Sequence, residues 1–519
     1  MKISVIGCGH LGATHAACMA SIGHEVIGVD IDDCKVSLLN SGRGWFHEPE
    51  LDSMLAENIK ASRLRFTSDF AEAGKFASVH FLGVATPGSE DGSYDLSQLH
   101  AALSSLVPHL RGDCLIIGKS TVAPGTAAKL QAKIESMLEQ DHGRAEVVWI
   151  PEFLREGYAV EDTLRPNRIV VGAASAGAVE IMREVYRPLT DAGVTMVVTD
   201  LATSELAKGA ANAFLATKIS FINAMADICT ATGSDISDLT YALGLDPRIG
   251  KAYLGAGIGY GGACLPKDVR GLRAFAEQLG AGNASLLLSA VEEVNASRID
   301  QVVQLVREVS SGIKGKRVAV WGVTFKPGTD DVRDSAGLQV AERLRSLDAT
   351  VTVYDPMGRG NALVACPELI YADTAITAAA NADVILVVTA WPEFARLDPA
   401  EVAEVVRSKA VVDACQGLSS CAWRDAGWHV SSLTGVDTGQ SQHNPPQGVA
   451  YGAHDIEDGH GVAQLADEAY RLDECLPDYE GHQECPPCMP VYTTAACRVS
   501  HGSEQAKQAQ HEQHARKTA

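Results

Sequence analysis

The sequence KISVIGCGHLG, residues 2–12, joins an apolar, strand-like run to the pattern GxGxxG formed by Gly7, Gly9 and Gly12. A helical stretch, ATHAACMASIG, follows it, and the next apolar run, EVIGVD, ends in Asp30, 18 residues after Gly12. This order of strand, glycine turn, helix, strand and acid is typical of a dinucleotide-binding βαβ unit. A glycine turn in an unrelated α/β protein, which is the alternative, needs no acid at that point.

Each part of this unit has a physical task. Gly7 permits the tight turn, Gly9 lets the backbone approach a pyrophosphate, and Gly12 lets the helix pack closely on the strand. The amides at the helix N-terminus then face the phosphates. Asp30 is expected to accept hydrogen bonds from the ribose hydroxyls and to repel a 2′-phosphate, which favours NAD over NADP. The alternative is that Asp30 only caps the end of its strand.

Short apolar runs alternate with helical stretches through the first 200 residues. Their continuous Val and Ile content suits the buried strands of a parallel sheet, and the helices between them give a βαβ rhythm. We therefore predict an α/β protein that begins with a Rossmann-like, doubly wound NAD-binding domain over residues 1–200. Its strands are expected near residues 2–7, 24–30, 78–87, 114–122, 146–153 and 168–172.

Long helices are predicted after residue 200. One runs from Thr203 to a stop at Gly233, and a second covers roughly residues 285–309. Apolar side chains recur every three or four residues along the first helix and form one stripe, at Leu206, Ala210, Phe214, Thr217, Phe221, Ala224 and Ile228. We predict a central helical domain over residues 201–312 that joins two subunits into a homodimer or a higher homo-oligomer.

The α/β alternation resumes at GKRVAVWG, from Gly315, and continues through ATVTVYDP, ADVILVVTAW and KAVVDAC. This part lacks GxGxxG, so it repeats the first domain only in architecture. We predict a second Rossmann-like domain over residues 313–436.

Residues 437–519 are expected to form a disordered tail, because the strand and helix patterns stop there. A zinc site built from Cys475, Cys485, Cys488, Cys497 and His482 is the alternative for this tail. Since Cys485 and Cys488 form a single CxxC without a partner pair, no metal is predicted.

The composition limits the possible functions. Hydrophobic residues make up 46% and charged residues 21% of the 519 residues, which is typical of a globular protein. The formal net charge of −22 disfavours nucleic acid or an anionic membrane as the main partner. No signal peptide or membrane-spanning stretch is recognisable, and the 13 cysteines show no framework spacing. We therefore predict a cytoplasmic protein with reduced thiols.

The stretch GYGGACLPKD, residues 259–268, is the first candidate for chemistry, because its glycines lead to Cys264 at the start of a predicted helix. A helix N-terminus favours a thiolate, Lys267 adds positive charge, and Asp268 lies one helical turn after the thiol. The glycines leave the sulfur open to a substrate. The alternative is a tight turn that contains an ordinary buried cysteine.

Other polar residues stand at positions suited to a site. Lys208 and Asn212 share one face of the long helix, although such a pair is more often a solvated surface. Glu152 and Glu156 follow a buried strand, where α/β sheets bind ligands, although they are equally consistent with ordinary loop acids.

Taken together, these segments resemble the nucleotide-sugar 6-dehydrogenases of the UDP-glucose/GDP-mannose dehydrogenase family, and most of all its members that oxidise UDP-glucose. The resemblance runs from residue 1 to about 435 and is carried by the following segments: GCGHLG, LRFTSDF, VATPGSEDGSYDLS, KSTVAPGT, PEFLREGYAVEDTLRPNRIVVG, DPRIGKAYLGAGIGYGGACLPKD, VTFKPGTDDVRDS and VVTAWPEF.

The resemblance implies a four-electron oxidation of UDP-glucose to UDP-glucuronate by NAD, through a thiohemiacetal and a thioester on Cys264. It implies that Lys208, Asn212 and Asp268 handle the 6-hydroxyl, its proton and the oxyanion. Thr121 would hold a water beside them, and Glu152 would be the base for hydrolysis. These six residues are the predicted catalytic set.

The resemblance also implies contacts with both ligands. The predicted cofactor contacts are Gly7, Gly9, Gly12, Asp30, Lys35, Thr86, Thr121, Glu156, Lys267 and Arg333. The predicted substrate contacts are Phe153, Leu154, Arg155, Lys208, Asn212, Tyr253, Gly261, Phe325 and Lys326, together with Arg248, which would reach the substrate of a neighbouring subunit.

Several positions depart from the family pattern. The dipeptide His10-Leu11 replaces Tyr-Val in the glycine loop, Ile150 replaces a polar residue, Ala263 replaces Ser, and residues 413–416 read DACQ instead of DGRN. Leu265 and the Ala-Pro order in STVAPGT favour the GDP-mannose enzymes. A GDP-mannose or UDP-N-acetylmannosamine 6-dehydrogenase is therefore the first alternative. A catalytically silent NAD and nucleotide-sugar-binding regulator is the second, although such a protein would not need Cys264, Lys208 and Asp268.

Overall fold

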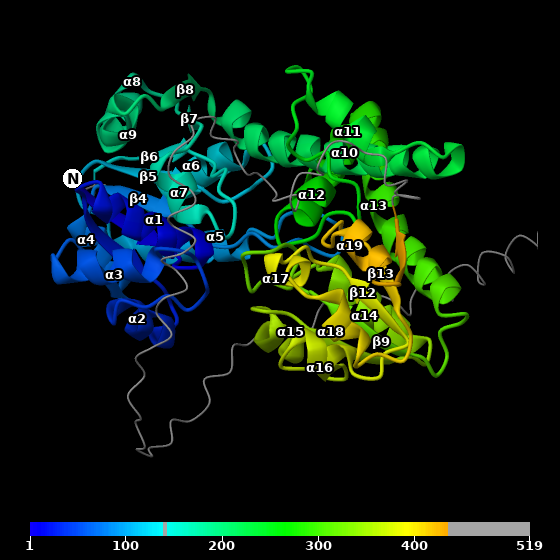
Figure 1. Ribbon diagram of the computed structural model, residues 1–519. Helices are drawn as coiled ribbons and strands as arrows, with labels where there is room; N and C mark the ends of the chain where they lie inside the picture. The colour runs from blue at the N-terminus through cyan, green and yellow to red at the C-terminus, as the bar shows by residue number, and fades with distance from the viewer. Residues whose placement is uncertain (139–142, 434–519) are drawn as a thin grey trace, which may run out of the picture. The chain divides into compact units, whose positions relative to one another are not determined.

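The computed structural model describes residues 1–138 and 143–433, which contain two β-sheets and two long helices (Figure 1). The first sheet has eight strands in the order β3-β2-β1-β4-β5-β6-β7-β8. Its strands are β1 (Lys2–Ile6), β2 (Glu25–Val29), β3 (Leu64–Thr67), β4 (Val79–Leu82), β5 (Cys114–Gly118), β6 (Ala145–Trp149), β7 (Arg168–Gly172) and β8 (Thr195–Thr199). The order of the first six strands is the dinucleotide-binding order, with the switch point between β1 and β4.

All six predicted strands are present in this sheet. However, β7 pairs with β6 in the antiparallel sense, so the fully parallel arrangement is wrong at this edge. Residues 150–167, which carry Glu152 and Glu156, connect β6 to β7. Two further strands, β3 and β8, were not predicted from the sequence.

Helices accompany the strands of this sheet. Buried aliphatic side chains form one hydrophobic cluster with α1 and a second with α5 and α6. The helices are α1 (His10–Ser21), α2 (Asp33–Asn40), α3 (Leu51–Lys60), α4 (Phe70–Phe76), α5 (Ser97–Leu106), the 3-10 turn η1 (Val107–His109), α6 (Thr126–Met137), α7 (Ala159–Leu164), α8 (Ala176–Val185) and α9 (Arg187–Asp191).

The long helix α10 (Leu201–Thr232) begins after Asp200, whose carboxylate accepts a bond from the amide of Thr203, and ends at Gly233 with φ +70°. The predicted stop at Gly233 is confirmed, since glycine adopts this left-handed cap readily. The other helices of this region are α11 (Ile236–Gly244), α12 (Leu265–Gln278) and α13 (Gly282–Val309). Helices α10, α12 and α13 pack on one another.

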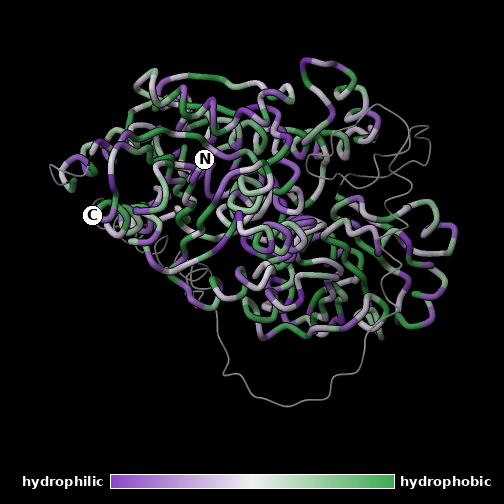
Figure 2. The backbone as a smooth tube through the Cα atoms, turned by 90° about the vertical axis from the view of Figure 1, so that its left-hand side faces the viewer, coloured by the Kyte–Doolittle hydropathy of each residue, from purple (hydrophilic) through white to green (hydrophobic). Residues whose placement is uncertain are grey.

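The second sheet has six strands in the order β11-β10-β9-β12-β13-β14. Figure 2 shows the backbone coloured by hydropathy, with green, hydrophobic stretches alternating with purple, hydrophilic ones. The strands are β9 (Arg317–Trp321), β10 (Thr350–Tyr354), β11 (Ile370–Tyr371), β12 (Val384–Val387), β13 (Ala410–Asp413) and β14 (His429–Ser432). The helices are α14 (Ala336–Ser346), α15 (Arg359–Ala365), α16 (Ala375–Ala379), α17 (Pro392–Ala395), α18 (Pro399–Ala403) and α19 (Ser420–Asp425).

The two sheets repeat one local design. Gly7 (φ +88°) follows β1, and Gly322 (φ +87°) follows β9. Asp30 accepts a bond from the loop amide of Cys8 at 2.8 Å, and Asp355 accepts one from the amide of Val323 at 2.7 Å. Asp355 is buried and also accepts bonds from Thr324, Met357, Gly358 and Trp391. Its acceptor sites are thus occupied by protein groups, so the second sheet repeats the architecture without an acid free for a ribose.

Within the described residues, no helix is long and apolar enough to cross a membrane. The predicted tail at residues 437–519, with the alternative zinc ligands Cys475, Cys485, Cys488, Cys497 and His482, lies outside the described residues.

Candidate active site

The glycine loop after β1 has the shape expected of a pyrophosphate cradle. A Cβ on Gly12 would lie 1.8 Å from the carbonyl oxygen of Gly7, so helix α1 approaches the strand as closely as predicted. A Cβ on Gly9 would meet nothing within 4 Å, so space is open over the loop. The Asp30 carboxylate is partly exposed and accepts bonds from the amides of Cys8 and Asp32 at 2.8 and 3.0 Å. Each of its oxygens keeps capacity for a ribose hydroxyl, so the residues fit NAD.

Two other predicted cofactor residues lie on loops at the ends of neighbouring strands. The hydroxyl of Thr86, after β4, donates to the backbone oxygen of Thr121, after β5, at 2.7 Å. This bond joins the loops that follow β4 and β5. Lys35, at the start of α2, lies 4.5 Å from the centre of the Trp45 ring.

Cys264 is the residue that precedes the first turn of α12, and Pro266 occupies that first turn. The backbone amide of Asp268 donates to the carbonyl of Cys264 at 2.9 Å, so the thiol and the carboxylate lie one helical turn apart, as predicted. Cys264 is exposed, which leaves the sulfur open to a ligand.

The glycines before Cys264 have a task that the sequence did not reveal. A Cβ on Gly261 would lie 2.4 Å from the backbone oxygen of Asp334, and one on Gly262 would lie 2.8 Å from the Phe325 ring. The amide of Gly262 also donates to the backbone oxygen of Arg333 at 3.1 Å. Because Gly261 and Gly262 have no side chains, their loop packs closely against residues 325–334, and this contact holds the segment that carries the thiol.

A shielded ion pair joins helix α10 to the loop after β6. The ammonium of Lys208 lies 2.9 Å from a carboxylate oxygen of Glu152, whose other oxygen accepts a bond from the Leu154 amide at 2.8 Å. Burial would lower the pKa of Lys208, but Glu152, Cys264 and Asp268 together raise it above its usual value. Lys208 is therefore a firmly protonated cation and not a solvated surface residue.

Asn212 lies one turn further along α10 and donates to a carboxylate oxygen of Asp268 at 2.6 Å. Lys267 donates to the other oxygen of Asp268 at 2.5 Å. Asp268 is completely buried, and these two donors compensate its charge. The structure thus brings Lys208, Asn212 and Asp268 together, as the sequence predicts.

The Cys264 thiol is not poised as a thiolate in this structure. Desolvation in the cleft raises its pKa, the ammonium of Lys208 opposes this, and the carboxylates of Glu152 and Asp268 raise it further. Because Cys264 is exposed, solvent reduces the effect of desolvation on its pKa. The carboxylates of Glu152 and Asp268 nevertheless raise this pKa as well. The helix N-terminus and Lys267 predict a thiolate, whereas desolvation, followed by these carboxylates, raises the pKa of Cys264 in the free chain.

A second group of charges lies between the loop at 151–157 and residues 325–334. Arg333 lies 2.6 Å from Asp331 and 3.2 Å from Glu156, and Lys326 donates to the backbone oxygen of Glu156. Burial and the facing carboxylate of Asp331 raise the pKa of Glu156 to about 8, against the effect of Arg333. Glu156, Lys326 and Arg333 were predicted from the resemblance; Asp331 was missed, although it lies in the quoted segment KPGTDDVRDS.

The remaining predicted residues divide into two groups. The Phe153 ring lies between Arg168, 3.9 Å away, and Lys208, 5.8 Å away. Arg155 is held by Asp162 at 2.7 Å, and charge interactions link it to Tyr253. By contrast, the Arg248 side chain is 87% exposed and pairs with Asp246, so no contact described for it joins it to this chain's own Cys264.

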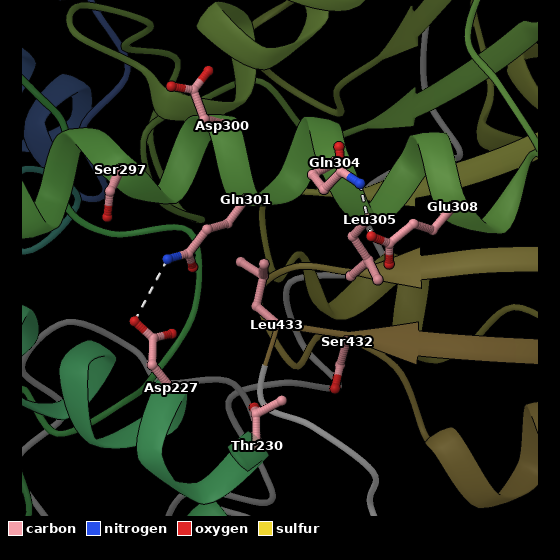
Figure 3. A pocket seen from close by; sticks show the side chains of 10 residues that line it. All are labelled: Asp227, Thr230, Ser297, Asp300, Gln301, Gln304, Leu305, Glu308, Ser432 and Leu433. Atoms are coloured by element: carbon pink, nitrogen blue, oxygen red, sulfur yellow. Dashed lines mark hydrogen bonds between the residues drawn. The ribbon is translucent and has the colours of Figure 1, made fainter.

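Two more observations concern residues that the sequence did not single out. Lys119, directly after β5, is buried beside Glu152 and Lys208. The only signal in the sequence was a lysine that directly follows the apolar run CLIIG, and it does not reveal these neighbours. A hollow of about 580 Å³ opens between α10, α13 and the end of β14 (Figure 3). Its lining contains none of the residues predicted for chemistry: Asp227, Thr230, Ser297, Asp300, Gln301, Gln304, Leu305, Glu308, Ser432 and Leu433.

Three models from one family match successive parts of the chain. The NAD binding domain of the UDP-glucose/GDP-mannose dehydrogenase family matches residues 1–190, its central domain matches residues 202–297, and its UDP binding domain matches residues 319–419.

Relatives of known name extend the likeness over most of the chain. A UDP-glucose 6-dehydrogenase of Rickettsia bellii is 39% identical over 419 residues, which cover 80% of this chain and 94% of the relative. One from Haloferax volcanii is 41% identical over 423 residues, with 80% and 96% covered. The solved structure of a UDP-glucose dehydrogenase from Pyrobaculum islandicum superposes with a TM-score of 0.77 at 35% identity, covering 84% of this chain and 98% of that one.

Proposed function

Because the chain belongs to the UDP-glucose/GDP-mannose dehydrogenase family, we propose that it oxidises UDP-glucose to UDP-glucuronate through a covalent intermediate on Cys264. The observation that carries the proposal is the gathering of Lys208, Asn212 and Asp268 beside this accessible thiol. The named relatives support UDP-glucose as the substrate. A silent regulator would not need a buried, charge-compensated arrangement of this kind next to a reactive side chain.

NAD, when bound, would supply the hydride acceptor for each oxidation, and the two hydrides require two NAD molecules in turn. Its proposed contacts in this chain are the glycine loop and Asp30 for the adenosine side, with Thr86, Lys267 and Arg333 nearer the reacting end. Lys35, Thr121 and Glu156 complete the proposed set.

Asp268 is the proposed acceptor of the 6-hydroxyl proton in the first oxidation. Lys208 cannot serve as that base while it is protonated, so its task is to stabilise the negative charge that develops on the oxygen. The amide of Asn212 adds a second donor. We place Thr121 beside them as the holder of a water molecule.

Cys264 then retains the aldehyde. A bond forms between its sulfur and C6, and the thiol proton moves to the former carbonyl oxygen, which gives a thiohemiacetal. Once Asp268 has passed its first proton to solvent, it accepts the hydroxyl proton of the thiohemiacetal in the second oxidation, and a thioester remains on the sulfur.

Hydrolysis completes the reaction. Glu152 accepts a proton from water, the new C–O bond forms, and the C–S bond breaks. The leaving thiolate regains a proton, so the product is a free acid and Cys264 is restored. The proposed substrate contacts for these steps are Phe153, Leu154, Arg155, Tyr253, Gly261, Phe325 and Lys326.

The division into domains at residues 1–200, 201–312 and 313–436 remains part of this proposal, and so does a homodimer built on α10. Four apolar side chains of the predicted stripe are exposed on this helix, at Leu206, Phe214, Phe221 and Ile228, which supports a partner surface there. Arg248, also exposed, is free to reach a neighbouring subunit.

GDP-mannose and UDP-N-acetylmannosamine are the alternative substrates. Product analysis with NAD and a panel of the three nucleotide sugars separates them: we expect UDP-glucuronate as the main acid. A main product from either other sugar would contradict the choice of UDP-glucose while leaving the family chemistry intact.

The covalent mechanism is tested with two variants. In Glu152→Gln, hydrolysis should slow by about 10²- to 10⁴-fold while both oxidations continue, so mass spectrometry should find a sugar-nucleotide adduct on Cys264. Cys264→Ala should make almost no acid. Normal acid production by Cys264→Ala would overturn the covalent mechanism, and slow turnover of Glu152→Gln without an adduct would remove Glu152 from the hydrolytic step.

A further inference from the structure

Lys119 is a buried cation whose charge is poorly compensated. It follows β5 directly, only 7% of the residue is exposed, and its amide donates to the Leu82 carbonyl at 3.1 Å. Within the described residues, the only hydrogen-bond acceptor of its ammonium is the Ile150 carbonyl, at the long distance of 3.4 Å. An ammonium has three N–H donors, so this one is far from satisfied.

The surroundings of Lys119 point toward one charged partner. Its ammonium lies 5.9 Å from the centre of the Phe81 ring on β4, and it acts on His15 of α1, whose pKa it helps to lower. The charged groups that act on Lys119 are Glu152, which favours its charge, and Lys208 of α10, which opposes it. Glu152 is therefore the carboxylate that balances Lys119, across the end of β6.

We propose that Lys119 is a positioning residue for hydrolysis, whose fixed positive charge keeps the Glu152 carboxylate ionised when Lys208 turns to the substrate. This inference rests on the proposed function, since it deepens the role of Glu152 there.

The need for a second cation follows from the ion pair. Lys208 and Glu152 lie 2.9 Å apart in the free chain, but Lys208 is also the proposed donor to the oxygen of the substrate. When Lys208 leaves that contact, Glu152 would be a shielded carboxylate without a cation, and such a group takes up a proton. A protonated Glu152 cannot accept a proton from water. Lys119 is buried and no substrate contact is proposed for it, so the substrate does not draw it away.

The titration of Lys119 agrees with this role. Desolvation lowers its pKa to about 8, because Glu152 only partly offsets the loss of solvent and Lys208 adds to the lowering. Lys119 is thus charged in the acid and neutral range, where Glu152 needs support. It becomes neutral above about pH 8, where a carboxylate stays ionised without help.

The test uses the full chain with Lys119→Met and Lys119→Arg. Quenched-flow mass spectrometry follows the loss of the Cys264 adduct after mixing with UDP-glucose and NAD between pH 5.5 and 9. A unit charge near a carboxylate is worth about one pH unit or more in this setting. We expect Lys119→Met to be about tenfold slower than the parent in the acid limb and equal to it near pH 9. Lys119→Arg should follow the parent throughout.

A structural role for Lys119 gives a different pattern. Lys119→Met would then slow the loss of the adduct by the same factor at every pH, or shift the melting temperature without a pH-dependent change, and either result would overturn the proposal. Failure of the proposed function is seen separately, because it would leave no adduct on Cys264 in the parent or in Glu152→Gln.

Discussion

The ammonium nitrogen of Lys208 lies 2.9 Å from Oε1 of Glu152, with only 4% and 13% of the two side chains exposed. The proposed reaction gives the two groups different tasks, so the pair must separate during turnover. In the free chain, Glu152, the proposed base for hydrolysis, is therefore paired with Lys208, the cation proposed to act in the first oxidation.

Removal of one partner of this ion pair by mutation is expected to destabilise the folded protein. Lys208→Met leaves the shielded Glu152 carboxylate without its ion-pair partner, so we expect about 3 kcal/mol loss in the free energy of unfolding. Lys208→Met combined with Glu152→Gln removes both charges and should recover part of that loss. Urea denaturation of the parent, both single variants and the double variant gives the coupling energy. Additive losses would show that the two side chains do not interact as a pair.

Asp30 is expected to set the choice of cofactor. Asp30→Asn keeps a side chain that can hold the Cys8 amide but removes the negative charge, so the preference for NAD over NADP should fall by about tenfold or more. Fluorescence titration with NADH and NADPH measures this without turnover. Asp33→Asn, at an exposed acid on α2, is the control and should leave the ratio unchanged. An unchanged ratio in Asp30→Asn would remove Asp30 from the ribose site.

The glycine loop gives a prediction about packing. Gly262 (φ +85°) and Gly250 (φ +71°) both have left-handed backbones, but only Gly262 faces a neighbour, the ring of Phe325. Gly250→Ala should cost about 1–2 kcal/mol of backbone strain. Gly262→Ala should cost about 1–3 kcal/mol more, because the methyl group collides with the ring. Adding Phe325→Leu should recover part of the excess. Equal melting temperatures for the two alanine variants would contradict the packing role.

This loop also shows the limit of prediction from sequence. Local patterns predicted several features, because the period of an apolar run and the cap of a helix depend only on neighbouring residues. These features are the strand that begins at Lys2, the stop at Gly233, the helix after Cys264 and the shared face of Lys208 and Asn212. The contact of Gly262 with Phe325 joins positions 63 residues apart, so no local pattern encodes it.

Electrostatics was harder still to predict. The helix N-terminus at Cys264 is a local feature and was found, but the shift in the thiol pKa comes first from desolvation in the folded chain and is increased by Glu152, which another segment brings near. Lys119 was missed for the same reason, since its isolation becomes visible only after Ile150 and Glu152 are placed beside it.

The raised pKa of Cys264 predicts slow alkylation. In the free enzyme the thiol is protonated at pH 7, so its rate with iodoacetamide should climb through pH 9 without a plateau. Glu152→Gln removes a carboxylate that raises this pKa and should speed alkylation at pH 8. Peptide mapping separates Cys264 from the exposed Cys34 and Cys421, which serve as internal controls. A plateau below pH 7 would mean that the thiolate already exists in the free chain.

The last prediction concerns the exposed stripe of α10. Phe214 and Phe221 are 66% and 49% exposed, although burial of a phenylalanine side chain is worth about 1.5–3 kcal/mol. More than half of the exposed large apolar side chains in the described residues lie between 206 and 287, which marks this region as a partner surface.

The stripe runs on the opposite side of α10 from Lys208 and Asn212, so a change there does not alter these two residues directly. Phe214→Asp should therefore weaken a dimer by about 3 kcal/mol or more, which is a rise of over a hundredfold in its dissociation constant. Val364→Asp on α15, with 64% exposure, is the matched control and should not change the mass. Sedimentation across a range of concentrations measures both. A fully active monomer of the parent chain, or an unchanged dissociation constant in Phe214→Asp, would show that the stripe is not the interface. If instead Phe214→Asp is monomeric and inactive but still binds NADH, the neighbouring subunit contributes to the substrate site, which agrees with the exposed position of Arg248.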